Sequence, residues 1–245
     1  MFIGLGTVAN VVAIAAGTGL GVLAGHRFTA RTRTLITQVL GLFTLVLGGS
    51  AIASGLSDAF SAAVGSSARL LIVLGALLIG GILGSALRIE DRLDAGVNRL
   101  HQRFSRGEED GRFVEGAVTA TLVFCIGPLA ILGSLSDGLG LGAEQLLVKS
   151  VMDGFAAIAF ASSFGVGVLV SAIPVALYQG LLTLLGFGLG NFLPAAQVDA
   201  LGATGGVILL GLGFRLAGIA KIPVGDLLPA LVLAPMLVAA VEVLV

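Results

Sequence analysis

Long apolar runs separated by short polar stretches dominate the chain. A helix that crosses about 30 Å of hydrocarbon needs roughly 20 mostly apolar residues, so charges and turn residues divide the sequence into candidate transmembrane spans. Eight are predicted, at 3–25, 35–56, 70–87, 114–135, 146–173, 174–192, 203–222 and 227–244. A seven-span alternative stays open, in which the fifth and sixth runs form one bent or re-entrant unit at Pro174. The predicted fold class is therefore all-α, a polytopic transmembrane helical bundle.

Basic residues gather at alternate ends of these spans, as the positive-inside rule requires. Arg residues at 27–33 follow the first span, others at 88–112 follow the third, and two basic residues at 215–221 end the seventh. Only Arg69 and Lys149 lie on the opposite side. The pattern predicts a multi-pass protein with both termini on the outer side of the membrane and the basic loops in the cytoplasm.

One polar segment, 89–113, connects the third and fourth spans. Its apolar residues recur every three or four positions, which predicts an amphipathic helix on the cytoplasmic membrane surface. The flanking halves resemble each other: Ala13-Ile14-Ala15 has a counterpart at 157–159. Because each half holds four spans, the copies are expected to form a parallel repeat. The predicted domains are 1–88 (first repeat, spans 1–3), 89–113 (linker), 114–145 (span 4 and outer loop) and 146–245 (second repeat, spans 5–8).

Composition and motifs exclude several classes of function. Residues are 57% apolar and 11% charged, whereas soluble domains carry about a quarter charged residues. The net charge of −1 argues against a nucleic-acid partner. The lone Cys125 excludes an intrachain disulfide and a multi-cysteine metal site. No P-loop, HExxH or GxSxG motif occurs, so we expect no cofactor, no metal site and no enzymatic activity.

Glycines recur at four-residue spacing within the apolar runs. Gly17, Gly21 and Gly25 form one such ladder, and Gly80 and Gly84 form another. Small residues at this spacing let helix backbones approach closely. We interpret the ladders as packing surfaces, and a narrow solute path lined by glycine is the alternative.

Charged and polar residues at membrane depth are the candidate site. Lys149 and Asp153 lie four residues apart and share a helix face, either as a structural ion pair or as an ion-coupling site. Thr7, Asn10 and Gln38 place hydroxyl and amide groups in the first two spans, where they either bridge helices or contact a solute.

Prolines mark two further candidate positions. Pro128 and Pro235 interrupt backbone hydrogen bonding in the fourth and eighth spans, which produces either a kink or a binding site for a solute. Gln179 follows Tyr178 near the start of the sixth span, where the two form an interfacial anchor or a gate.

Several motifs resemble one bacterial family. They are Gly6-Thr7-Val8-Ala9-Asn10, Cys125-Ile126-Gly127-Pro128, Ile131 to Gly138, Lys149-Ser150-Val151-Met152-Asp153-Gly154, Ile173-Pro174-Val175, Tyr178-Gln179-Gly180 and Leu228-Pro229-Ala230-Leu231. Together the chain resembles the YqgA-like and YdfK-like inner-membrane proteins, a domain of unknown function labelled a putative transport protein. The resemblance implies a bacterial plasma (inner) membrane location and transport without naming a substrate. It gives added weight to Asn10, Pro128, Asp137, Lys149, Asp153 and Gln179.

These observations support two main hypotheses about function. The first is a membrane transporter or facilitator for a small solute or ion. The second is a structural or regulatory membrane protein that assembles, for example as a homo-oligomer, through its Gly-rich helix faces. A third, an intramembrane enzyme, lacks a nucleophile paired with a base or metal, because His26 and His101 lie outside the spans. The lipid bilayer is the one partner expected under every hypothesis.

Overall fold

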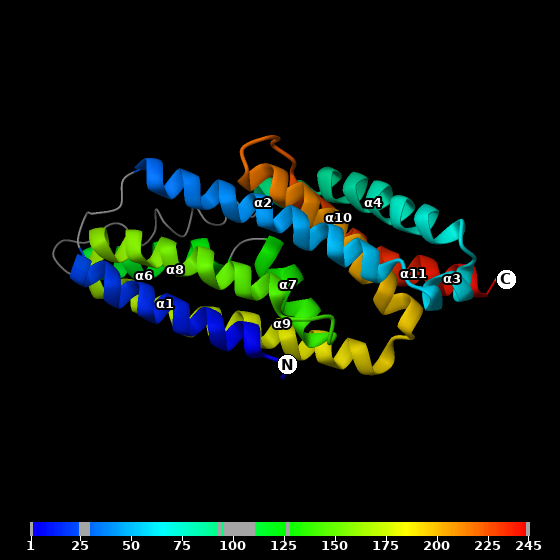
Figure 1. Cartoon of the computed structure of the whole chain (residues 1–245), viewed down its shortest axis with the longest axis horizontal. Coiled ribbons are helices and arrows are strands. Elements are labelled where there is room, and N and C mark those ends of the chain that lie inside the picture. Colours follow the sequence, from blue (N-terminus) through cyan, green and yellow to red (C-terminus); the bar gives the residue numbers. More distant parts are fainter. Residues whose placement is uncertain (1, 25–29, 93–94, 96–110, 126–127, 244–245) are drawn as a thin grey trace. The chain divides into compact units, whose positions relative to one another are not determined.

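The computed structural model describes residues 2–24, 30–92, 95, 111–125 and 128–243, and over these ranges the chain is helical with short connections (Figure 1). Its elements are α1 Leu5–Ala24, α2 Ala30–Gly55, α3 Asp58–Val64, α4 Ala68–Ala86, α6 Gly111–Cys125, α7 Pro128–Gly138, α8 Glu144–Phe164, the 3₁₀ turn η1 Gly165–Ser171, α9 Ala172–Phe192, α10 Ala195–Leu216, the 3₁₀ turn η2 Val224–Leu227 and α11 Ala230–Glu242. The all-α fold class is confirmed for the described residues.

Five helical stretches are long and apolar enough to cross a membrane, and two bent helix pairs raise the number to as many as seven. The bent pairs are Gly41–Gly55 with Asp58–Val64, at 51°, and Gly116–Cys125 with Leu129–Gly138, at 60°. The predicted fifth and sixth spans form one continuous stretch of 49 residues, Glu144–Phe192, and this accounts for the difference from eight. The eight-span count stays a prediction.

The chain folds as two compact units. Unit 1 contains Met1–Thr37 and Leu93–Phe187, and unit 2 contains Gln38–Arg92 and Gly188–Val245. Each unit therefore takes helices from both halves of the sequence. The predicted domains describe an order along the chain, whereas the units describe proximity in space, so the domain division and the internal repeat both stay predictions. Most of the predicted amphipathic linker helix, 89–113, falls outside the described residues. The described residues within it, 89–92, 95 and 111–113, are helical.

In unit 1, α1 lies along α8 at a distance that only glycine allows (Figure 1). A Cβ added at Gly17 would meet the Gly154 carbonyl oxygen, and one added at Gly21 would meet the carbonyl oxygen of Ile158. The contacts advance in the same direction along both helices, so α1 and α8 run parallel. The packing interpretation of Gly17 and Gly21 is confirmed, while Gly25 lies outside the described residues.

The second helix of the 49-residue stretch turns back along α8. α8 ends at Gly165, whose φ of 74° places it in the left-handed region that favours glycine. On α7, Gly133 faces Leu146 near the start of α8, while Gly138 faces Thr183 and Phe187 in the second half of α9. The far end of α9 is therefore near the start of α8, and the two helices run antiparallel.

The apolar core of unit 1 lies where these helices meet. Buried Ile14, Ala157, Val168 and Val175 pack around Phe124 of α6. The Phe124 ring stacks at 6.0 Å between centroids on Phe160 of α8, a tilted aromatic pair. This core holds α1, α6, α8 and α9 together beside the polar residues described below.

Unit 2 uses glycine in the same way but with antiparallel helices. A Cβ at Gly80 would meet the Ala230 backbone of α11, and one at Gly84 would meet the Asp226 carbonyl oxygen of η2. α2 and α10 approach equally closely at Gly48 and Gly206. The packing interpretation of the Gly80 and Gly84 ladder is therefore also confirmed.

Replacing Gly17 by Ala should destabilise the protein, whereas replacing Gly19 should not. A methyl group at Gly17 clashes with the α8 backbone, and such overpacking costs about 1–3 kcal/mol. Gly19 on the exposed side of α1 has no atom within 4 Å of an added Cβ. Thermal unfolding of the detergent-purified variants measures this difference. Equal melting temperatures for Gly17→Ala and wild type would contradict the α1–α8 contact.

Candidate functional site

A buried polar cluster joins α1 to α8 in unit 1. Lys149 and Asp153 are one turn apart on α8, and both are buried; Asn10 on α1 is fully buried. The Asn10 amide Nδ2 donates a hydrogen bond of 2.8 Å to Asp153 Oδ2. Lys149 Nζ donates to the same oxygen and forms the ion pair. Both charged side chains therefore point into the unit, which the four-residue spacing alone could not establish.

The cluster keeps unused hydrogen-bonding capacity. Asn10 Oδ1 and the hydroxyl of Thr7, one turn earlier on α1, are buried without a partner in the described part of the chain. Lys149 has three N–H donors, and among the described residues its side chain bonds only to Asp153. Because an unpaired buried polar atom is costly, these groups indicate a place where water or a solute binds.

α9 contributes a second set of buried polar groups to unit 1. Gln179 is fully buried, and neither its amide nitrogen nor its amide oxygen has a partner among the described residues. The hydroxyl of Thr183, one turn further along the same buried face, is also unpartnered there. The prediction from sequence included Gln179 but missed Thr183; its spacing of four from Gln179 was the available signal.

The break between α6 and α7 lies in the same unit as the ion pair. α6 ends at Cys125 and α7 begins at Pro128, a residue without a backbone N–H and well suited to the first turn of a helix. The Cys125 thiol interacts electrostatically with Lys149 and Asp153. Tyr178, the neighbour of Gln179, interacts with Cys125 in turn. Cys125 and Tyr178 therefore belong to the same part of unit 1 as the ion pair.

Asp137 fixes the start of α1 against the end of α7. Both of its carboxylate oxygens accept hydrogen bonds of 3.2 Å from the backbone N–H of Gly4, and Oδ2 accepts another of 3.2 Å from Gly6 N–H. A carboxylate at a helix N-terminus satisfies free N–H groups and opposes the helix dipole. The resemblance singled out Asp137, and its place in the structure is that of a helix cap beside the cluster.

Two of the predicted site residues lie in the other unit. Gln38 is exposed on α2, and Pro235 lies inside α11, which continues from Ala230 to Glu242 without a break. Of the two predicted proline positions, Pro128 coincides with a helix break and Pro235 does not. The structure thus groups Thr7, Asn10, Lys149, Asp153 and Gln179 with the α6–α7 break in unit 1, and leaves Gln38 and Pro235 apart from them.

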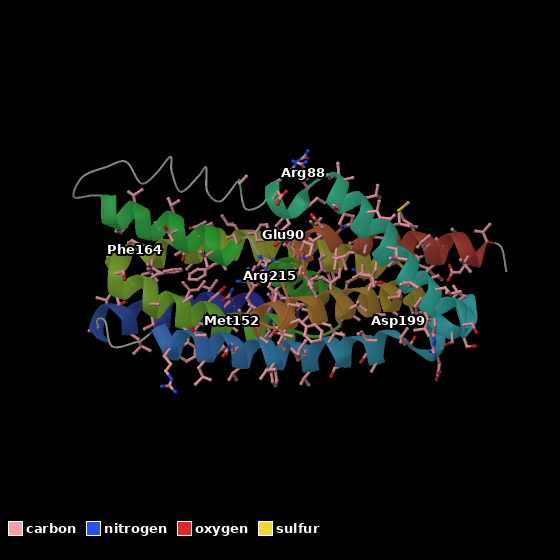
Figure 2. The ribbon with its side chains drawn as sticks, turned by 90° about the horizontal axis from the view of Figure 1, so that it is seen from above. Arg88, Glu90, Met152, Phe164, Asp199 and Arg215 are labelled. Carbon is pink, nitrogen blue, oxygen red and sulfur yellow. The ribbon has the colours of Figure 1, made fainter. Side chains whose placement is uncertain are left out.

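Unit 2 has its own polar cluster, which sequence analysis did not identify. Glu90 forms an ion pair with Arg215 at the end of α10, and its carboxylate accepts a hydrogen bond of 2.6 Å from Gly225 N–H (Figure 2). Asp226 accepts one of 2.9 Å from Glu90 N–H. These contacts tie the turn after α4 to η2 and α10. Among the described residues, no group of three or more His, Cys, Asp and Glu could hold a metal ion.

Removing one charge of the Lys149–Asp153 pair should cost more stability than removing both. Asp153→Leu or Lys149→Met alone leaves a buried charge unpaired, at a cost of about 3–5 kcal/mol. The double variant Lys149→Met, Asp153→Leu leaves no buried charge unpaired, so its stability should approach that of wild type. A denaturant-based double-mutant cycle on the purified protein measures the coupling. A double variant no more stable than either single variant would contradict a buried pair.

Comparison with known proteins places the chain among membrane proteins without an assigned activity. The family described as "Protein of unknown function (DUF554)" matches residues 5–239. "Uncharacterized membrane protein YdfK" of Bacillus subtilis (strain 168) is 30% identical over 233 residues, 95% of each chain. "Uncharacterized protein YqgA" of Escherichia coli (strain K12) is 29% identical, over 96% of this chain and 97% of the relative. No solved structure matches significantly.

Proposed function

This chain belongs to the DUF554 family of proteins of unknown function, and we propose that it is a membrane transporter or facilitator for a small solute or ion. The binding site in this proposal is the cluster of Asn10, Lys149 and Asp153 in unit 1. We place the protein in the bacterial plasma membrane with both termini on the outer side. The resemblance to bacterial relatives and the loop charges support this location.

The buried ion pair is the observation that carries the proposal. Ionisable side chains inside a membrane are costly and generally serve a solute or ion pathway. A buried ion pair also adds little stability compared with apolar residues of similar size, so stability alone does not account for Lys149 and Asp153. Their unused hydrogen-bonding groups, together with Asn10 Oδ1, are what a polar solute requires when it leaves water.

The α6–α7 break adds independent support. Discontinuous helices next to a polar centre are typical of transporter binding sites, because the ends of half-helices offer free backbone N–H and C=O groups. The alternative of assembly through Gly-rich faces is not favoured: Gly17, Gly21, Gly80 and Gly84 already contact neighbouring helices of the same chain.

We further propose that Glu144–Phe192 crosses the membrane twice, which gives eight spans. A straight helix of this length would extend about 70 Å, more than twice the hydrocarbon thickness. The left-handed Gly165 and the antiparallel course of α9 support a reversal at η1.

Single cysteines should report this topology through a membrane-impermeant thiol reagent. In a Cys125→Ser background, Leu141→Cys and Phe192→Cys should be labelled from the same side of intact cells or oriented vesicles, and Val166→Cys from the other. These three positions are exposed in the structure. Labelling of positions 141 and 192 from opposite sides would instead support the seven-span alternative.

The transport proposal predicts that Asp153→Asn abolishes solute movement. Purified protein in proteoliposomes, tested against a broad panel of radiolabelled solutes and ion gradients, should take up at least one solute. Asp153→Asn should lower that uptake at least tenfold, because the ion pair is lost. The Lys149→Met, Asp153→Leu double variant should be equally inactive although it has no unpaired charge, which separates loss of function from loss of folding.

Asp199→Asn is the matched control, since Asp199 lies in unit 2 and accepts a hydrogen bond of 2.5 Å from Ser57 Oγ. It should retain uptake. Absence of uptake for every solute in wild type, or full activity of Asp153→Asn, would refute the proposal.

A further inference from the structure

We propose that the solute is a small zwitterion, an amino acid with a short uncharged side chain, which binds between Lys149 and Asp153. This inference rests on the proposed function and names the chemical class that the same site takes. It follows from the charge balance of the cluster, from its free donors and acceptors, and from the way the pair is built.

The first observation is the net charge of the Lys149–Asp153 cluster and its surroundings. Two neighbouring elements, α1 and α9, contain no ionisable acid or base other than Tyr178, and Glu144 at the start of α8 is exposed. Asp137 on α7 is bound to the backbone at the start of α1, and Arg112 and Glu115 lie at the far end of α6 from Cys125. Lys149 and Asp153 therefore form a neutral pair among the residues that surround them.

The charge of a bound solute determines whether the buried site carries a net charge. A cation near Asp153 would leave Lys149 as excess buried positive charge, and an anion near Lys149 would leave excess negative charge on Asp153. Excess buried charge is costly in a medium of low polarity. A zwitterion leaves the total at zero, and it gives each charged side chain a new partner of opposite sign.

The unpaired atoms match the same chemistry. An ammonium group offers three N–H donors, and Asp153 with the unpartnered Asn10 Oδ1 provides adjacent acceptors, because Asn10 already bonds Asp153 through its other amide atom. A carboxylate accepts hydrogen bonds, and Lys149 has N–H groups that Asp153 does not use. A neutral polar solute would use neither charge and would have to compete with the intact ion pair.

The pair can open without moving a helix. Lys149 and Asp153 are both on α8, so changes of side-chain rotamer separate them while the α1–α8 backbone contact stays in place. Gly154 and Gly17 hold the two backbones together just beyond Asp153, and from this close approach we infer a solute with a short side chain. Glycine, alanine and serine are zwitterions with short, uncharged side chains.

Binding of glycine, L-alanine and L-serine tests this inference on the full-length protein in detergent. Each should raise the melting temperature of wild type, since a ligand that binds only the folded state stabilises it. Acetate and methylammonium, which carry only one of the two charges, should have at least tenfold lower affinity at the same pH and ionic strength. Lys149→Met and Asp153→Asn should each weaken glycine binding at least tenfold, and Asp199→Asn should leave it unchanged.

The double variant Lys149→Met, Asp153→Leu covers the case in which a single variant fails to fold, and it should not bind glycine. No binding of the three amino acids, or equal binding by wild type and the variants, would overturn the zwitterion assignment. If acetate or methylammonium instead bound in an Asp153-dependent way, the assignment would fail while the transport proposal stood. If proteoliposomes also took up no solute, both would fail.

Discussion

At Gly17 and Gly21 the backbone of α1 lies directly against α8, because no Cβ separates the two helices. Van der Waals contact of this kind is the main attraction between helices in lipid, where the hydrophobic effect does not favour association. The contact also fixes the axial register of α1 relative to α8. Asn10 consequently lies opposite Asp153, and the glycine contacts help to set the register in which the two side chains form their hydrogen bond.

The short helix α7 determines how this pair is closed at the end where α1 and α8 begin. Its Asp137 bonds the first backbone N–H groups of α1, and its Gly133 faces the same Leu146 side chain that faces Gly6. α7 can do this because the break before Pro128 lets it leave the direction of α6 by 60°. The helix break therefore gives α7 the direction from which Asp137 caps the start of α1.

The sequence was most informative where composition and spacing determine structure directly. Apolar runs predicted the helices, and glycine spacing predicted the packing faces at Gly17, Gly21, Gly80 and Gly84. Lys149 and Asp153 could be placed on one face, but only the approach of α1 shows that this face is buried against Asn10. Pro235 shows the opposite limit: an interior proline permits a break without requiring one, and α11 continues through it.

The grouping of helices in space could not be read from the sequence, because it depends on contacts between distant segments. Asn10 and Asp153, which join α1 to α8, are more than 130 residues apart in the sequence. Glu90 is likewise more than 130 residues from its partners Gly225 and Asp226. The arrangement also bears on the site that we propose in unit 1. The rigid contact joins two helices, whereas the ion pair is contained in one, so the charged groups can exchange partners without disturbing the packing that holds them in place.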